Sequence, residues 1–158
     1  MRVIEQVLFW AHGLSAAAWF GAIFYRTFVI DGKAFAYFPD RAEYERFSTH
    51  LAHGMRYLVT AGILTCGLSG FALLGLRWDG GNATWVGLMA AKAAVWLAAC
   101  GLFTYVSWVH WVWRSVAAPA EAAAYRREGT ILAAAMVVLA GTGFALGQAC
   151  RLTHAATG

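Results

Sequence analysis

The sequence predicts an all-α integral membrane protein in which four helices form a bundle across the bilayer. Of its 158 residues, 61% are hydrophobic and only 13% are charged, whereas a water-soluble domain has about 25% charged residues. The mean hydropathy is +0.58. Four apolar segments are each long enough to cross a hydrocarbon core about 30 Å thick. We therefore predict one transmembrane domain over residues 1–158, with spans at about 3–28, 51–76, 85–113 and 129–150.

Charge and cysteine usage exclude several other classes of protein. The net charge of +4 comes from lysines and arginines in the connections, and no basic cluster is dense enough to predict a nucleic-acid partner. The expected partner is membrane lipid. The three cysteines, Cys66, Cys100 and Cys150, lie in apolar segments and form no CxxC pair, which argues against a disulfide framework and against a zinc site.

The first span contains a histidine deep in its apolar sequence. Arg2 precedes the apolar run and the alanines at 16–18 resemble a signal-peptide cleavage region, but the run continues to Ile30 and is therefore long enough to span. At the depth of His12 no water is present to satisfy the ring nitrogens, so the side chain needs a partner. We predict that His12 is a ligand, and a buried hydrogen bond is the alternative.

The connection after the first span, residues 31–48, has a different composition. Charged side chains are interleaved with aromatic ones, and Pro39 interrupts the run. Such a mixture is typical of a short amphipathic helix that lies in the membrane interface, and this is the structure we predict for the connection. A surface that docks a protein partner is the alternative.

The second span is entered through three basic side chains, His50, His53 and Arg56. Small residues along this span would let a neighbouring helix or the plane of a cofactor approach closely. The glycines concerned are Gly62, Gly67 and Gly70. Residues 77–84 follow the span, and their glycines and asparagine predict a tight turn.

The third span carries Lys92 near its start and His110 near its end. The two positions are 18 residues apart, which makes five whole turns, so both side chains project from one helix face, ~27 Å apart along the axis. Ionisable groups within a span are costly, and they usually face the bundle interior and mark a functional site. The alternative is that Lys92 extends to the nearer interface and that His110 lies at the membrane boundary.

The fourth span contains Gly143 and Gly147 in a small-xxx-small arrangement, through which we expect a homo-oligomer. His154, beyond its end, is expected in a solvated tail. The first and third connections hold most of the lysines and arginines, so the positive-inside rule places both connections in the cytoplasm. We predict a multi-pass protein of a bacterial-type inner (cytoplasmic) membrane with both termini outside.

With that orientation the ionisable side chains fall at two depths. His50, His53 and His110 share a level near the inner face, whereas His12 and Lys92 share a level in the outer half. Two histidines that face each other across a helical bundle can hold haem b through their imidazole nitrogens. We predict one or two haems, with an inner site formed by His53 or His50 together with His110 and an outer site formed by His12.

Several roles stay open for the remaining polar side chains. Arg56, one turn from His53, can pair with a haem propionate near the interface. His50 and His53, at positions i and i+3, can instead chelate one copper or zinc ion, or lie in the interface without a ligand. Lys92 is the catalytic candidate, because it can bind a cofactor carboxylate, carry a proton or attract an anionic substrate.

Parts of all four spans resemble the HemJ-type membrane protoporphyrinogen oxidases. In the first conserved block of that family, a helix that bears a histidine leads to a Trp, a Gly and a Phe-Tyr pair, and the matching residues here are His12, Trp19, Gly21, Phe24 and Tyr25. Trp85 and Lys92 are similar to the Trp and the characteristic lysine of the family's third helix. Shorter similarities to its second and last helices involve Arg56, Thr65, Gly70, Glu128, Thr130, Ile131 and Leu132.

The resemblance implies a four-helix membrane protein that binds haem b, with His12 as an iron ligand and Lys92 as the second functional residue. Members of the family oxidise protoporphyrinogen IX to protoporphyrin IX and pass electrons onward to quinone. The same architecture resembles the copper-resistance D domain, whose members are linked to copper handling. The HemJ pattern has a further histidine in its third helix where this chain reads Gly-Leu-Phe at residues 101–103.

That difference makes haem binding, rather than porphyrin oxidation, the main prediction. We predict a membrane b-type haem protein that carries out electron transfer or oxidoreduction, with quinone or a porphyrin as its small-molecule partner. Three alternatives stay open: a protoporphyrinogen IX oxidase of the HemJ type, a copper-handling membrane protein, and a small structural subunit of a membrane complex.

Overall fold

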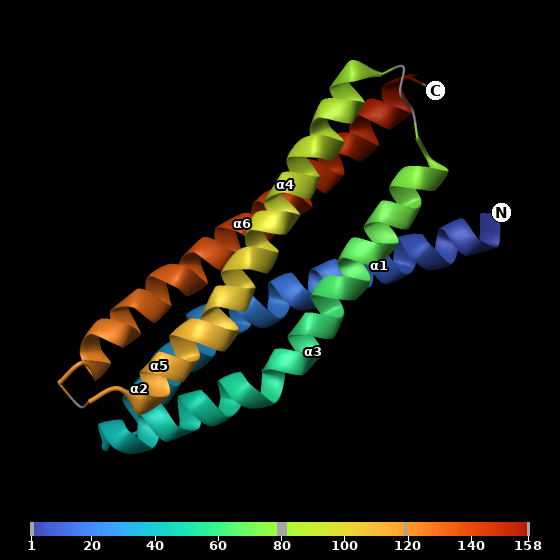
Figure 1. Ribbon diagram of the computed structural model, residues 1–158. Coiled ribbons are helices and arrows are strands. Elements are labelled where there is room, and N and C mark those ends of the chain that lie inside the picture. Colours follow the sequence, from blue (N-terminus) through green and yellow to red (C-terminus); the bar gives the residue numbers. More distant parts are fainter. Residues whose placement is uncertain (1, 79–81, 119, 158) are drawn as a thin grey trace.

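The structure, a computed structural model, describes residues 2–78, 82–118 and 120–157, with side chains as far as Thr153. The chain forms four helical rods (Figure 1). The first rod is α1 (Arg2–Tyr25), the π-helical segment η1 (Arg26–Ile30) and α2 (Asp31–Tyr37), and the second is α3 (Arg41–Leu76). The third is α4 (Ala83–Tyr105), the π-helical segment η2 (Val106–His110) and α5 (Trp111–Val116), and the fourth is α6 (Ala122–Thr157).

Each rod is long and apolar enough to cross a membrane, over Arg2–Tyr37, Arg41–Leu76, Ala83–Val116 and Ala122–Thr153. The described residues contain no β-strand. The prediction of an all-α four-helix bundle is therefore confirmed. Large apolar side chains are exposed on the outward faces of all four rods, as expected for a multi-pass membrane protein. Examples are Leu14, Leu68, Leu97 and Val138.

The first connection is shorter than the sequence predicts. Residues 31–37 continue the first rod and residues 41–48 belong to α3, so the connection does not form a separate interfacial helix. The break is confined to residues 38–40, where a proline precedes Asp40. The Asp40 carboxylate accepts a hydrogen bond from the backbone N–H of Ala42 at 2.9 Å and so caps α3. The Arg41 side chain also donates to the backbone oxygen of Phe35 at 2.7 Å across the same turn.

The other two connections are only partly described. Residues 79–81 of the predicted glycine turn, Pro119 in the third connection and the side chain of His154 lie outside the described residues. At the end of the glycine turn, the side-chain oxygen of Asn82 accepts a hydrogen bond from the backbone N–H of Trp85 at 3.0 Å. This bond satisfies one of the free N–H groups at the start of α4.

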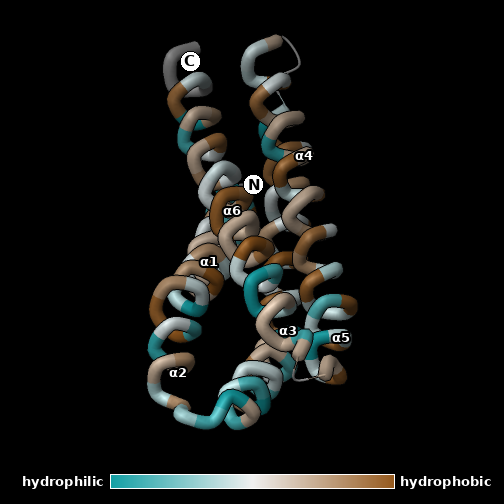
Figure 2. Tube along the Cα trace, turned by 90° about the vertical axis from the view of Figure 1, so that its left-hand side faces the viewer, coloured by the Kyte–Doolittle hydropathy of each residue, from teal (hydrophilic) through white to brown (hydrophobic). Residues whose placement is uncertain are grey.

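The rods pack as two pairs. α1 lies along α3 and α4 lies along α6, and contacts between α1 and α6 join the pairs (Figure 1). The buried core takes one side chain from each rod, namely Trp19, Ile63, Ala99 and Met136. Two cavities lie towards opposite ends of the bundle from this core. Figure 2 shows that hydrophilic residues gather at the end formed by α2, α5 and the start of α3.

Candidate functional site

A cavity of about 480 Å³ lies between the two helix pairs, towards the end of the bundle where the chain termini lie (Figure 1). All four rods contribute to its wall, which is mostly apolar. The basic side chains on the wall are His12, Arg77, Lys92 and Arg151, and no aspartate or glutamate is among the described lining residues. The cavity therefore combines an apolar interior with an excess of positive charge.

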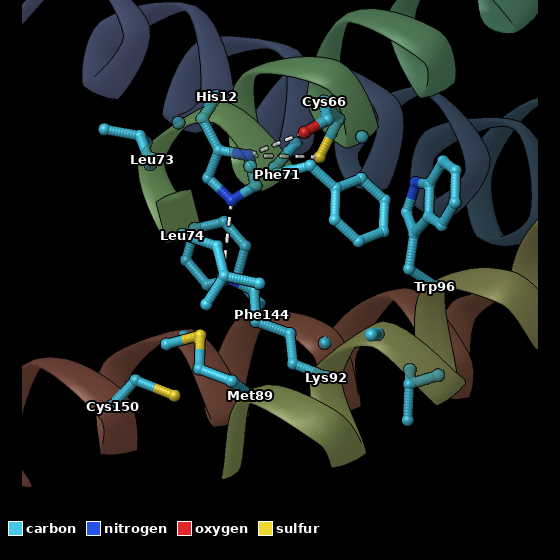
Figure 3. Close-up of a pocket in the computed structure, with 18 of the residues that line it drawn as sticks. His12, Cys66, Phe71, Leu73, Leu74, Met89, Lys92, Trp96, Phe144 and Cys150 are labelled. Carbon is cyan, nitrogen blue, oxygen red and sulfur yellow. Dashed lines mark hydrogen bonds between the residues drawn. The ribbon is translucent and has the colours of Figure 1, made fainter. Parts of the chain in front are cut away.

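His12 of α1 projects into this cavity from between α1 and α3 (Figure 3). Its Nδ1 lies 2.8 Å from the backbone oxygen of Cys66, an acceptor only, so Nδ1 carries the proton and donates it. Nε2 then keeps its lone pair and faces away from α3. A backbone carbonyl of α3 therefore fixes the tautomer of a histidine in α1.

Lys92 of α4 meets His12 across the cavity (Figure 3). Its Nζ lies 3.3 Å from His12 Nε2, so the ammonium donates a hydrogen bond to the imidazole lone pair. The two residues are 80 positions apart in the sequence. Lys92 is half-buried and is directed inward, which removes the alternative that it extends to the nearer interface.

Glycines in α3 and α6 make room for these side chains. A Cβ at Gly70 would lie 2.9 Å from His12 Cε1, and a Cβ at Gly67 would overlap the indole of Trp96. In α6, a Cβ at Gly147 would lie 3.4 Å from Lys92 Nζ. The absence of side chains at these positions lets the imidazole, the indole and the ammonium occupy the space between helices.

The face of α6 that carries the small residues packs against another helix of the same chain. Gly147 faces Lys92, and a Cβ at Gly143 would contact Val95 of α4 at 3.7 Å. This face packs against α4 and does not present a flat surface to a second copy. The predicted homo-oligomer stays a prediction, and it would need a different face from the one that the sequence suggested.

Two buried donors on the cavity wall have no acceptor. The indole N–H groups of Trp19 and Trp96 are buried and make no hydrogen bond among the described residues. Both residues line the cavity. Because buried polar groups in folded proteins are nearly always paired, acceptor atoms of a ligand or of water in this space would satisfy these two donors.

Two arginines stand on the cavity wall near the ends of their helices. Arg77, at the C-terminal end of α3, forms an ion pair with Glu5 of α1. Arg151, late in α6, is exposed. The sequence analysis predicted no functional role for either arginine. They did carry a signal, since they are among the few basic residues on that side of the predicted membrane.

His110 lies away from this cavity, where η2 packs on α6. Its side chain is 1% exposed, and its Nδ1 lies 3.7 Å from Glu128 Oε1. A Cβ at Gly129 would lie 3.1 Å from His110 Nε2, and the ring of Tyr125 is 5.9 Å away. Neither ring nitrogen makes a hydrogen bond among the described residues. The His110 side chain is therefore shielded from solvent, and its predicted place at the membrane boundary stays open.

The three basic residues at the start of the second span do not share one site. They are His50, His53 and Arg56. His50 and His53 are exposed and line a second cavity of about 660 Å³. The guanidinium of Arg56 lies 5.2 Å from the ring centre of Trp108, and its Nε and Nη2 are buried without a hydrogen-bond partner. The predicted pairing of His110 with either exposed histidine therefore stays a prediction, because the contacts found for His110 are with Glu128, Trp111 and Tyr125.

The described part of the chain contains no cluster of side chains that could bind a metal ion by themselves. Residues 2–78, 82–118 and 120–153 contain no cluster of three or more His, Cys, Asp or Glu side chains arranged to hold an ion. The structure brings His12 and Lys92 of the predicted outer level together, whereas the inner haem site stays a prediction. No family model, curated protein or solved structure matches this chain.

Proposed function

We propose that this protein is a membrane b-type haem protein that carries out electron transfer or oxidoreduction, with His12 as the iron ligand. The observation that carries this proposal is the 2.8 Å hydrogen bond from His12 Nδ1 to the Cys66 carbonyl, which leaves Nε2 directed into an apolar cavity. Histidines that ligate metals nearly always donate their other ring N–H to a carbonyl or a carboxylate in this way.

The residues around the cavity fit haem b in size and charge. The volume of about 480 Å³ lies within the range of cofactor sites. Haem carries two propionates, and the wall offers Arg77, Lys92 and Arg151 as cations. The aromatic rings of Phe71 and Trp96, whose centres are 5.7 Å apart, supply apolar surface on the wall, with Phe71 nearer to His12 (Figure 3). We therefore assign one haem to this cavity.

Residues of α1, α3 and α4 would each have a separate role in binding haem. His12 would hold the iron through Nε2, and the Cys66 carbonyl would keep the ring in its orientation. When bound, haem supplies a one-electron centre whose potential depends on its ligands and burial. Lys92 Nζ, which now donates to His12, would then be free to hold a proton or bind a carboxylate in the cavity. The apolar wall would exclude water.

Oxidation of protoporphyrinogen IX, as in the HemJ-type proteins that the sequence resembles, is the second candidate function. The contact between His12 and Lys92 favours it, because these are the two residues that the resemblance implies are functional. The same cations would bind the carboxylates of a porphyrin substrate, and quinone is the acceptor we propose. A copper site has less support, because the described residues form no three-ligand cluster.

Location and orientation belong to the same proposal. We place the protein in a bacterial-type inner membrane, with the arginine-rich end of the bundle in the cytoplasm and both termini outside. The haem cavity would then lie in the outer half of the bilayer.

The purified protein is expected to be coloured. Its visible spectrum should show a Soret band that sharpens on reduction, and a pyridine haemochrome assay should give about one haem b per chain. The protein is expressed with a haem precursor in the medium, so that the supply of haem does not limit the haem content of the protein. A colourless protein that gains no Soret band on addition of haem, although it stays monodisperse and helical, would contradict the proposal.

Gly70→Ala is expected to lower haem retention about 10-fold to 100-fold. The new Cβ would lie 2.9 Å from His12 Cε1 and would push the imidazole away from the Cys66 carbonyl that orients it. Alanine is the better helix former, so loss of haem could not be attributed to loss of the helix. Haem content per chain is the measurement.

Gly62→Ala is the matched control, because a Cβ at Gly62 meets no atom within 4 Å. The control should keep the haem content of the unmodified protein. Equal haem content in both variants would show that the orientation of His12 does not matter for binding.

A further inference from the structure

The second cavity, of about 660 Å³, lies at the opposite end of the bundle from His12. Its wall is built by the start of α3, by α5 and by the start of α6, which meet at the lower left of Figure 1. This is also the hydrophilic end in Figure 2. The haem proposal uses none of the residues on this wall.

Positive charge predominates on the wall. Four arginines line the cavity, and Glu45 is the one carboxylate among the described lining residues. The arginines are Arg41, Arg46, Arg114 and Arg126. Glu45 accepts hydrogen bonds from Arg114 Nε at 2.8 Å and from Arg126 Nη1 at 3.1 Å, so one negative charge is shared between two guanidinium groups. His50 and His53 add further donors to the same wall.

One of these guanidinium groups is buried and incompletely paired. The Arg114 side chain is only 6% exposed, and its Nη2 makes no hydrogen bond among the described residues. A buried charged donor without an acceptor is costly unless a ligand satisfies it. Glu45 satisfies Arg114 Nε, so the acceptor that is missing among the described residues is one for Arg114 Nη2.

The helix that carries Arg114 also has exposed apolar side chains. Val112, Trp113 and Val116 are exposed large hydrophobic residues on the helix that carries Arg114. A ligand with an anionic head and apolar tails would match both features. Basic pockets between transmembrane helices bind the head groups of anionic phospholipids in this way.

We propose that this cavity binds the phosphate group of an anionic phospholipid. Arg114, Arg126 and Arg46 hold the phosphate oxygens, and the acyl chains lie along the exposed side of α5. The proposal rests on the multi-pass architecture and not on haem binding, so either proposal can fail without the other.

The test measures unfolding temperature in mixed micelles. Protein in a neutral detergent is titrated with phosphatidylglycerol, with phosphatidylcholine and, separately, with inorganic phosphate. Phosphatidylglycerol is expected to raise the Tm in a saturable way, whereas phosphatidylcholine and inorganic phosphate are not. Arg126→Gln and Arg46→Gln should each raise the apparent Kd for phosphatidylglycerol about 5-fold.

Arg127→Gln is the matched control, because it removes the same charge from α6 at an exposed position that does not line the cavity. Its apparent Kd should equal that of the unmodified protein. Arg46 is a safe second site, since its side chain is 72% exposed and its loss leaves the core intact. Equal Kd values in all three variants would overturn the proposal. A saturable Tm increase with inorganic phosphate but not with phosphatidylglycerol would overturn the assignment to lipid.

Discussion

Replacing His12 by alanine is expected to lower haem retention by at least ~100-fold. Losing an outer hydrogen-bond partner of a metal ligand costs about 10-fold to 100-fold in affinity, and losing the ligand itself costs more. No second histidine is among the described residues that line this cavity, so none can replace His12 there. Haem per chain after size-exclusion chromatography should therefore fall from about one to near zero.

His53→Ala is the control for this variant. His53 is an exposed histidine on α3 that lines the other cavity, so its removal should leave the haem content unchanged. Full haem content in His12→Ala would remove the site that we assign. Loss of haem in His53→Ala, with His12→Ala unaffected, would instead place the cofactor at the inner level.

Glu45→Gln is expected to destabilise the folded protein by about 3 kcal/mol. Glu45 joins α3 to Arg114 of α5 and Arg126 of α6, and the Arg114 side chain is only 6% exposed. Removing one partner of a buried pair leaves a buried charge without compensation, which costs about 3–5 kcal/mol. The lower end applies because Glu45 is 21% exposed. Reversible unfolding by a denaturing detergent measures this loss.

Glu43→Gln supplies the comparison on the same helix. Its carboxylate lies 4.0 Å from Arg46, and both side chains are largely exposed, at 51% and 72%. An exposed pair of this kind contributes less than about 1 kcal/mol. A loss of stability in Glu45→Gln no larger than in Glu43→Gln would show that the three-helix ion cluster contributes little.

The four spans could be predicted because length and hydropathy alone define them. An apolar run such as 85–113 can bond its backbone groups within its own segment inside a bilayer only as a helix. Depth counting also placed His12 and Lys92 at one level, and the structure has their side-chain nitrogens 3.3 Å apart. Two residues at equal depth can meet when both face the bundle interior.

Depth does not fix the direction in which a side chain points, and the inner level shows this limit. His110 shares its predicted level with His50 and His53, yet it is buried against α6 near Gly129 and Tyr125, whereas the other two are exposed on α3. The rotation of a helix about its axis depends on which helices pack against it, and this cannot be predicted from amino-acid composition.

Contacts between residues far apart in the sequence could not be predicted either. Glu45 lies 69 positions from Arg114 and 81 from Arg126, and the composition of residues 31–48 looked like that of an interfacial helix. The carbonyl of Cys66, which orients His12, carries no sequence signal because every residue has one. These contacts follow from the way the helix pairs cross.

The most direct test of the central claim is the addition of imidazole to His12→Gly. Removing the side chain leaves a space beside Gly70 and the Cys66 carbonyl where a free imidazole can take the place of the ring. We predict that His12→Gly purifies without haem and that imidazole restores a Soret band to it in a saturable manner when haem is present. A Soret band of full intensity without imidazole, or none at saturating imidazole, would contradict the assignment of His12 as the iron ligand.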